Sequence, residues 1–159
     1  MSKAFTREDS EAAEELPFVP DLDLRPGEKN YVTPEGAARL REDVARLRAA
    51  PRDDPRARAA TEQRLAALCR RLELMEVVDP ASQPADRVLF GATVTLRDEE
   101  GGERSYRVVG IDEADAAARR VSWRSPIAQA LIGRRVGDVV TLPGPGGERD
   151  VELVAINYV

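Results

Sequence analysis

Residues 30–47 read NYVTPEGAARLREDVARL, and this stretch decides how the first half of the chain folds. Thr33 is a favourable N-cap residue, and Pro34 suits the first position of a helix, where its missing N–H group costs no hydrogen bond. Apolar residues then recur at spacings of four and three, on one face of a helix: Leu40, Val44 and Leu47. We therefore predict an amphipathic helix that starts at Pro34 and ends just before Pro51, because proline disfavours helical geometry in the residue before it.

A second helix is predicted from about residue 56 to residue 77, after the turn PRDDP at residues 51–55 and before Pro80, which should end it. Its apolar residues also repeat at spacings of three and four: Leu65, Leu68, Leu72 and Met75. Neither apolar stripe is wide enough to give its helix a core of its own. The two helices should therefore pack against each other as an antiparallel hairpin of coiled-coil type.

From residue 88 onward the pattern changes from helix to strand. Apolar and polar side chains alternate in residues 88–96. Further strands are predicted at 105–111, 121–123, 139–142 and 151–156. Ser125 and Pro126 should begin a short helix that Gly133 ends. The expected fold class is α+β, with a short antiparallel helical hairpin followed by a small antiparallel β domain that one helix crosses.

The composition excludes several classes of function. The 159 residues include no histidine and one cysteine, Cys69, which rules out histidine-dependent triads, a disulfide within the chain and a cysteine–histidine zinc site. Any chemistry must therefore use carboxylates or belong to a partner. With a formal net charge of −5, the chain is a poor candidate for unaided binding to duplex DNA, where Lys and Arg must neutralise phosphates.

Composition also divides the chain into three segments. Residues 1–29 are acidic and rich in proline, and we expect them to form a flexible leader that is not a signal peptide. Residues 30–79 hold the predicted hairpin, and residues 80–159 hold the β domain. No apolar run is long enough to cross a membrane, so we expect no membrane association and a cytoplasmic location.

Two motifs lie in the hairpin and in the β domain: NYVTPEG at residues 30–36, and SPIAQALIG at residues 125–133 followed by VGD at residues 136–138. Together they resemble the GreA/GreB family of bacterial transcription elongation factors. The start, MSKAFT, and the acidic leader are more similar to GreB than to GreA. The resemblance implies an FKBP-like β domain and a monomer that binds RNA polymerase at the rim of the secondary channel, against a coiled coil of the largest subunit. It implies contact with nucleic acid only within the transcription complex.

The tip of the hairpin departs from the family pattern. The resemblance implies a longer hairpin, with an Asp and a Glu separated by two residues before an Asn at its tip, and this chain has no such stretch. Its short hairpin is similar to that of the Rnk-type proteins. Asp53 and Asp54 are the acids at the apex, and in a complex with polymerase they could bind the Mg²⁺ of the polymerase active site. In the other interpretation, Asp54 caps the second helix. The chain is expected to have no cofactor of its own.

The β domain offers six candidate contacts with polymerase: Asp112, Glu113, Trp123, Ser125, Pro126 and Ile127. The two acids could instead lie in a solvated loop, and the last three residues could serve as helix cap, first turn and core. We expect a regulator of elongation, not an enzyme, with weak or no stimulation of transcript cleavage. The alternatives are a GreB-type factor that stimulates cleavage through its tip acids and, from the FKBP-like fold, a prolyl isomerase. The isomerase is disfavoured because its pocket needs aromatic side chains, and the chain has only three Phe, three Tyr and one Trp.

Overall fold

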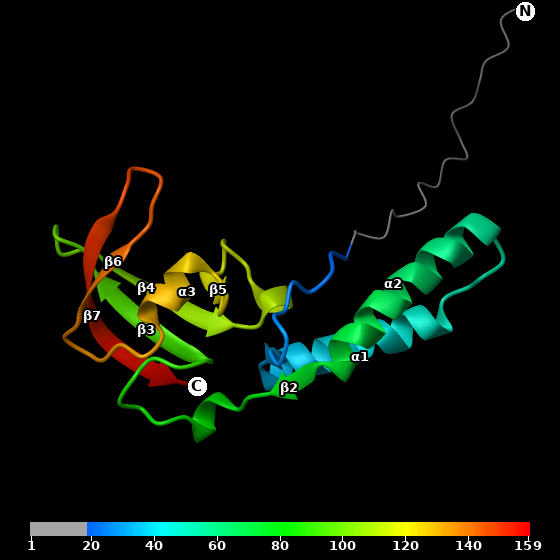
Figure 1. Cartoon of the computed structure of the whole chain (residues 1–159), viewed down its shortest axis with the longest axis horizontal. Coiled ribbons are helices and arrows are strands. Elements are labelled where there is room, and N and C mark those ends of the chain that lie inside the picture. The colour runs from blue at the N-terminus through cyan, green and yellow to red at the C-terminus, as the bar shows by residue number, and fades with distance from the viewer. Residues whose placement is uncertain (1–18) are drawn as a thin grey trace, which may run out of the picture.

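The two helices of the hairpin begin where the sequence predicts them. In the computed structural model, which describes residues 19–159, α1 spans Pro34–Ala49 and α2 spans Pro55–Glu73. The Thr33 hydroxyl accepts a hydrogen bond from the Gly36 N–H group at 3.1 Å and so caps α1. Figure 1 shows the two helices side by side, extending away from the β-rich part of the molecule.

One apolar cluster holds α1 and α2 together. Its buried members are Leu40, Val44, Leu47 and Leu68. The half-buried residues that pack against them are Val19, Leu65, Cys69, Leu72 and Met75. Both predicted apolar stripes therefore face each other, as expected for an antiparallel hairpin.

The second helix ends earlier than predicted. α2 stops at Glu73, and Met75–Val77 forms the strand β2, which pairs in parallel with β1, Asn30–Val32. The prediction of a helix to residue 77 is therefore wrong. Pro80 begins a 3₁₀ turn, η1 (Pro80–Ser82), rather than ending the helix. The strand replaces the last helical turn because its backbone groups pair with a segment far away in the sequence, which helical periodicity does not record.

The β domain is built on a five-stranded sheet with the strand order β5-β4-β3-β7-β6. Its strands are β3 (Ala92–Arg97), β4 (Glu103–Val109), β5 (Arg120–Ser122), β6 (Val139–Leu142) and β7 (Arg149–Tyr158). Three neighbouring pairs are antiparallel, as predicted, but β4 and β5 are parallel, so the sheet is mixed. The connection that makes β5 run parallel to β4 contains a second 3₁₀ turn, η2 (Ile111–Glu113). The α+β fold class is confirmed.

The core of the β domain lies between the sheet and α3, Pro126–Leu131, which Figure 1 shows lying against the strands. Its buried residues are Val88, Ala92, Val94, Leu96, Val108, Ala128, Leu131, Val140, Leu142, Val151 and Leu153. The alternation predicted for residues 88–96 is seen within β3. Val88 is also buried but lies outside the strand, because β3 begins only at Ala92. Before it, Gly91 adopts a left-handed backbone (φ 86°) that interrupts the extended chain.

Residues 19–29 lead into β1 and contact both parts of the molecule. Val19 packs against the apolar cluster of the hairpin, and Glu28 pairs with Arg124 of the β domain at 3.9 Å. The leader expected from the sequence runs from residue 1 to residue 29, and its first part, up to residue 18, lies outside the described residues. Within residues 19–159, no helix is long and apolar enough to cross a membrane.

Candidate functional site

The tip of the hairpin carries Asp53 and Asp54, both exposed to solvent. The Asp54 carboxylate accepts hydrogen bonds from the backbone N–H groups of Arg56 at 3.3 Å and Ala57 at 3.1 Å, so it caps α2 as one interpretation of the sequence predicts. Among residues 19–159, no group of three or more His, Cys, Asp or Glu side chains is placed to hold a metal ion. A cation at the tip would therefore need ligands from a partner in addition to these two carboxylates.

An open groove of about 460 Å³ lies beside β5 and α3. Its lining is mainly apolar and includes Val121, Ser125, Pro126, Ile127 and Pro143. The Ser125 hydroxyl accepts a hydrogen bond from the Ala128 N–H group at 3.2 Å and caps α3, and Pro126 is exposed at the first helical position. Ile127 is half-buried and also packs against the domain core. Three of the six candidate contacts therefore share one surface, and no aromatic ring from residues 19–159 lines it.

A charged pair also lines this groove. Arg120 pairs with Asp115 at 3.3 Å, and the Asp115 carboxylate accepts a hydrogen bond from the Ala118 N–H group, also at 3.3 Å. These contacts hold the pKa of the Asp115 carboxyl below its usual value, chiefly through the Ala118 hydrogen bond and next through Arg120. Asp115 is therefore ionised at neutral pH, and the apolar groove has an ion pair as its polar part.

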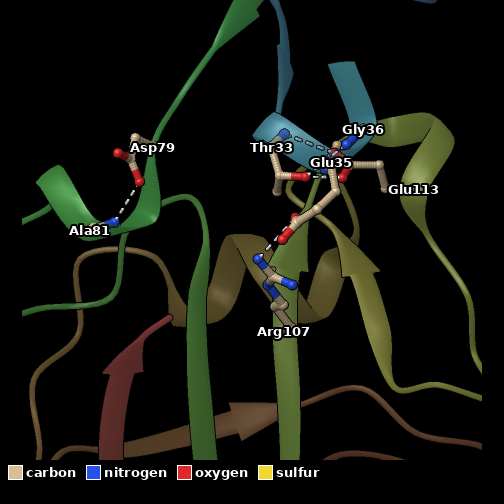
Figure 2. A network of polar contacts seen from close by, with 8 residues as sticks. Thr33, Glu35, Gly36, Asp79, Ala81, Arg107 and Glu113 are labelled. Carbon is tan, nitrogen blue, oxygen red and sulfur yellow. Dashed lines mark hydrogen bonds and ion pairs between the residues drawn. The ribbon is translucent and has the colours of Figure 1, made fainter. Parts of the chain in front are cut away.

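The carboxylate of Glu113 joins the β domain to the start of α1. It accepts hydrogen bonds from the Thr33 N–H group at 3.1 Å, from the Thr33 hydroxyl, and from the Gly110 N–H group at 2.9 Å. Figure 2 shows the Glu113 carboxylate against Thr33 and Gly36 at the first turn of the helix. A negative charge is favourable there, because the free N–H groups and the positive end of the helix dipole lie at this terminus. One domain thus supplies an acidic cap to the first helix of the other.

Two glycines make room for this carboxylate. A Cβ atom at Gly36 would overlap the Glu113 carboxyl group. A Cβ atom at Gly110 would lie 2.5 Å from the same carboxylate and 2.7 Å from the carbonyl oxygen of Tyr31. The glycine of the NYVTPEG motif therefore leaves room for a contact with the other domain. An isolated glycine in the first turn of a helical pattern is a signal of close approach that sequence reasoning could have used.

Two ion pairs add to the contact between the hairpin and the β domain. Arg71 of α2, whose side chain is 3% exposed, donates from Nε to Asp112 Oδ2 at 2.7 Å. Glu35 of α1 pairs with Arg107 of β4 at 3.5 Å, as Figure 2 shows. Sequence reasoning missed Arg71 as a functional residue, because nothing in the local pattern distinguishes it from the exposed arginines around it.

Aromatic rings complete this domain junction. The Trp123 ring meets the Tyr31 ring edge-on, with ring centres 5.4 Å apart. The Phe90 ring is tilted by 48° from the Tyr31 ring, with ring centres 6.3 Å apart. The structure therefore brings Asp112, Glu113 and Trp123 together at the junction. Asp112 keeps a partly exposed side chain (43%), whereas the Glu113 carboxylate is occupied by the hairpin and by Gly110. The other candidates lie away from this junction: Ser125, Pro126 and Ile127 line the groove, and Asp53 and Asp54 lie at the tip of the hairpin.

Comparison with known proteins gives consistent matches. The family model described as "Transcription elongation factor, GreA/GreB, C-term" matches residues 83–158. The chain is 40% identical over 152 residues to a transcription elongation factor GreA of Alkalilimnicola ehrlichii, with 80% of this chain and 96% of the relative covered. It is 34% identical over 155 residues to a transcription elongation factor GreB of Neisseria meningitidis serogroup B, with 82% and 95% covered.

Two solved structures of related factors are also similar to this chain. A GreA/GreB factor from Nitrosomonas europaea is 28% identical, with a TM-score of 0.44, and the match covers 82% of this chain and 98% of that chain. The GreA factor homolog 1 (Gfh1) protein of Thermus thermophilus is 26% identical, with a TM-score of 0.43, and the match covers 82% and 99%.

Proposed function

The chain belongs to the GreA/GreB family of transcription elongation factors, and from that membership we propose that it binds RNA polymerase at the secondary channel and modulates elongation with weak or no stimulation of transcript cleavage. The proposal of weak or no stimulation of cleavage rests on the length of the hairpin. Its helices have 16 and 19 residues, which is about 24 Å and 28 Å at ~1.5 Å per residue. The spaced Asp and Glu that the family resemblance implies at the tip are absent.

A short hairpin opposes cleavage because its tip extends less far toward the Mg²⁺ of the polymerase active site. A hairpin shortened by three turns loses about 16 Å, at ~5.4 Å per turn. A carboxylate must lie within about 2.1 Å of Mg²⁺ to ligate it. The alignment with the Alkalilimnicola GreA extends over 152 positions although it uses only 80% of the 159 residues here, so part of that relative faces a gap in this chain. A hairpin that is short for the family would produce a gap of this kind.

The groove beside α3 is the proposed contact with polymerase. Its apolar lining, with Val121, Pro126 and Ile127, suits the apolar side chains of a helical coiled coil such as the one that the family resemblance implies on the largest subunit. The Asp115–Arg120 pair would contact polar groups around that helix. In this proposal the factor is a cytoplasmic monomer that meets nucleic acid only through polymerase. Any Mg²⁺ involved belongs to polymerase, and the factor has no cofactor of its own.

A cleavage-stimulating factor remains a second candidate because Asp53 is exposed at the apex and its carboxylate does not cap α2. If the β domain docked deeply enough, Asp53 and Asp54 could ligate the polymerase Mg²⁺, and polymerase would cut its own RNA. In neither case is the factor itself an enzyme. Within the part of the chain that the structure describes, the groove has no aromatic lining, which gives no support to a prolyl isomerase.

The binding proposal is tested with single substitutions in the groove. Pro126→Glu puts a charge on the apolar surface at the first turn of α3, where an acid suits the helix dipole, so the domain should remain folded. Val139→Glu is the matched control, since Val139 is 64% exposed and does not line the groove. Pro126→Glu should weaken binding to core polymerase at least tenfold in a titration, with Val139→Glu close to wild type. Equal affinities for all three proteins would refute the groove as the docking site.

A further inference from the structure

Arg71 is a buried cation at the base of the hairpin. Its side chain is 3% exposed, although Arg70 next to it in α2 is 68% exposed. A buried guanidinium is stable only where its N–H groups find acceptors, because an unpaired buried charge is strongly unfavourable. The identity of its acceptors therefore shows what this residue holds together.

The partners of Arg71 come from the two ends of the segment that leads into β1, at Pro20 and Asn30, and from Asp112 of the β domain. Nη2 donates to the backbone carbonyl oxygen of Pro20, in the segment before β1. Nε donates to Asp112 Oδ2 at 2.7 Å, in the β domain. The carbonyl oxygen of Arg71 accepts from Asn30 Nδ2 at 3.3 Å. One side chain with a rigid fork of donors thus joins the leader, the hairpin and the β domain, which the single ammonium of a lysine reproduces poorly.

The segment that contains Pro20 is attached at both ends. At one end, Val19 packs against the apolar cluster of the hairpin. At the other end, Glu28 pairs with Arg124 at 3.9 Å, and the Asn30 N–H group donates to the Leu74 carbonyl oxygen at 2.8 Å. Figure 1 shows this segment, in blue, running to the base of the hairpin.

We propose that residues 19–29 are a strap which, through Arg71, holds the hairpin at one angle to the β domain. The Glu113 carboxylate, the Glu35–Arg107 pair and the contact of Tyr31 with Trp123 all attach at β1 or the first turn of α1. Attachments that lie so close together restrict rotation of the hairpin about that place less than an attachment farther away on α2 does. Arg71 supplies a second point of attachment on α2, and the strap closes over it. The angle matters because a rotation of ~20° at the base moves the end of a ~24 Å helix by about 8 Å.

The inference goes beyond the proposed function, since it concerns the free protein and is tested without polymerase. Nitroxide labels are attached at Arg52→Cys and Glu100→Cys in a Cys69→Ala background, which leaves one label at the hairpin tip and one on the exposed β3–β4 turn. Pulsed electron spin resonance then gives the distribution of tip-to-turn distances. The full chain should give one narrow distribution.

Two perturbations test the strap, and each has a control. A chain that begins at residue 25 lacks Val19 and Pro20, whereas a chain that begins at residue 19 keeps both. Arg71→Met removes the guanidinium, and Arg70→Met is its exposed neighbour. The chain that begins at residue 25 and the variant Arg71→Met should each broaden or shift the distance distribution, while circular dichroism shows an intact hairpin. The two controls, the chain that begins at residue 19 and Arg70→Met, should each match the full chain. Arg71→Lys should fall between Arg71→Met and wild type.

A purely structural role for Arg71 would lower the midpoint of unfolding but leave the distances of the folded protein unchanged. An unchanged narrow distribution in the chain that begins at residue 25 overturns the proposal. If Arg71→Met fails to fold, that shortened chain decides alone, because it leaves every residue of α1 and α2 in place.

Discussion

Gly36→Ala should destabilise the protein, although the same change in an ordinary helix is stabilising. In a helix interior, alanine is more favourable than glycine by about 1 kcal/mol. At this position the new Cβ atom would overlap the Glu113 carboxyl group. That carboxyl group is the end of a flexible side chain and can move away, so the cost is set by the hydrogen bonds that it loses and not by the overlap itself.

Three hydrogen bonds are at stake, from the Thr33 N–H group, the Thr33 hydroxyl and the Gly110 N–H group. A buried donor left without an acceptor costs about 1–3 kcal/mol, and two of these donors are backbone N–H groups. Thr33 and Gly110 are both buried, so water replaces the carboxylate poorly. After the gain of about 1 kcal/mol in helix propensity is subtracted from the cost of the two backbone donors, we expect Gly36→Ala to reduce the free energy of unfolding by roughly 1–5 kcal/mol.

Urea titrations followed by circular dichroism at 222 nm and by the fluorescence of Trp123 measure this change. In a Glu113→Ala background the overlap is gone, so Gly36→Ala should become neutral or stabilising by up to about 1 kcal/mol. Gly110→Ala is the control, because its Cβ atom would also lie 2.7 Å from the Tyr31 carbonyl oxygen and Glu113→Ala cannot relieve that contact. An increase in stability for Gly36→Ala in the wild-type background would refute the reasoning.

The remaining predictions concern single contacts. Leu68→Ala should lower the free energy of unfolding by about 2–4 kcal/mol in urea titration, because Leu68 is buried between the helices, and a loss below about 0.5 kcal/mol would contradict that packing. Asp54→Ala should lower it by about 1 kcal/mol through loss of the α2 cap, whereas Asp53→Ala should change it by less than about 0.5 kcal/mol. Tyr158→Phe should destabilise by about 1–2 kcal/mol, since the Tyr158 hydroxyl accepts from the Leu89 N–H group at 2.9 Å and donates to the Arg87 carbonyl oxygen at 2.6 Å. Burial raises the pKa of Tyr158 above its ordinary value of 10.0, so its contribution should be complete below pH 10 and disappear as the pH rises through the higher pKa of the folded protein. Stability profiles of wild type and Tyr158→Phe that stay parallel above pH 10 would count against this.

Local signals in the sequence predict the start of each α-helix within residues 19–159. Thr33, Asp54 and Ser125 each precede a proline and each accepts a hydrogen bond from the following turn. These caps act within a few residues, so a single sequence contains all that is needed to find them. The long-range features were missed. The β1–β2 ladder replaces the end of the predicted second helix, and the parallel β4–β5 pair makes the predicted antiparallel sheet mixed.

The sequence also predicted candidate-site residues that adjoin along the chain better than those whose partners lie far away in the sequence. Ser125, Pro126 and Ile127 adjoin in sequence and share the groove. Asp112 and Glu113 look like exposed loop acids in the sequence, but the structure places them against Arg71 and Thr33 of the hairpin. Their partners are distant along the chain, so no local pattern reveals the junction. Whether these acids also contact polymerase stays a prediction.

Release of RNA fragments from a stalled, backtracked polymerase tests the proposed function most directly. The protein is added at a concentration that saturates polymerase, with a GreB of full hairpin length as positive control and the variant Asp53→Asn, Asp54→Asn beside it, since asparagine can keep the α2 cap. We predict that neither the wild type nor the double variant accelerates cleavage appreciably, while both change the rate of elongation. Strong cleavage by the wild type that the double variant loses would contradict the proposal and show that the β domain docks deeply enough to bring the tip acids to the polymerase Mg²⁺.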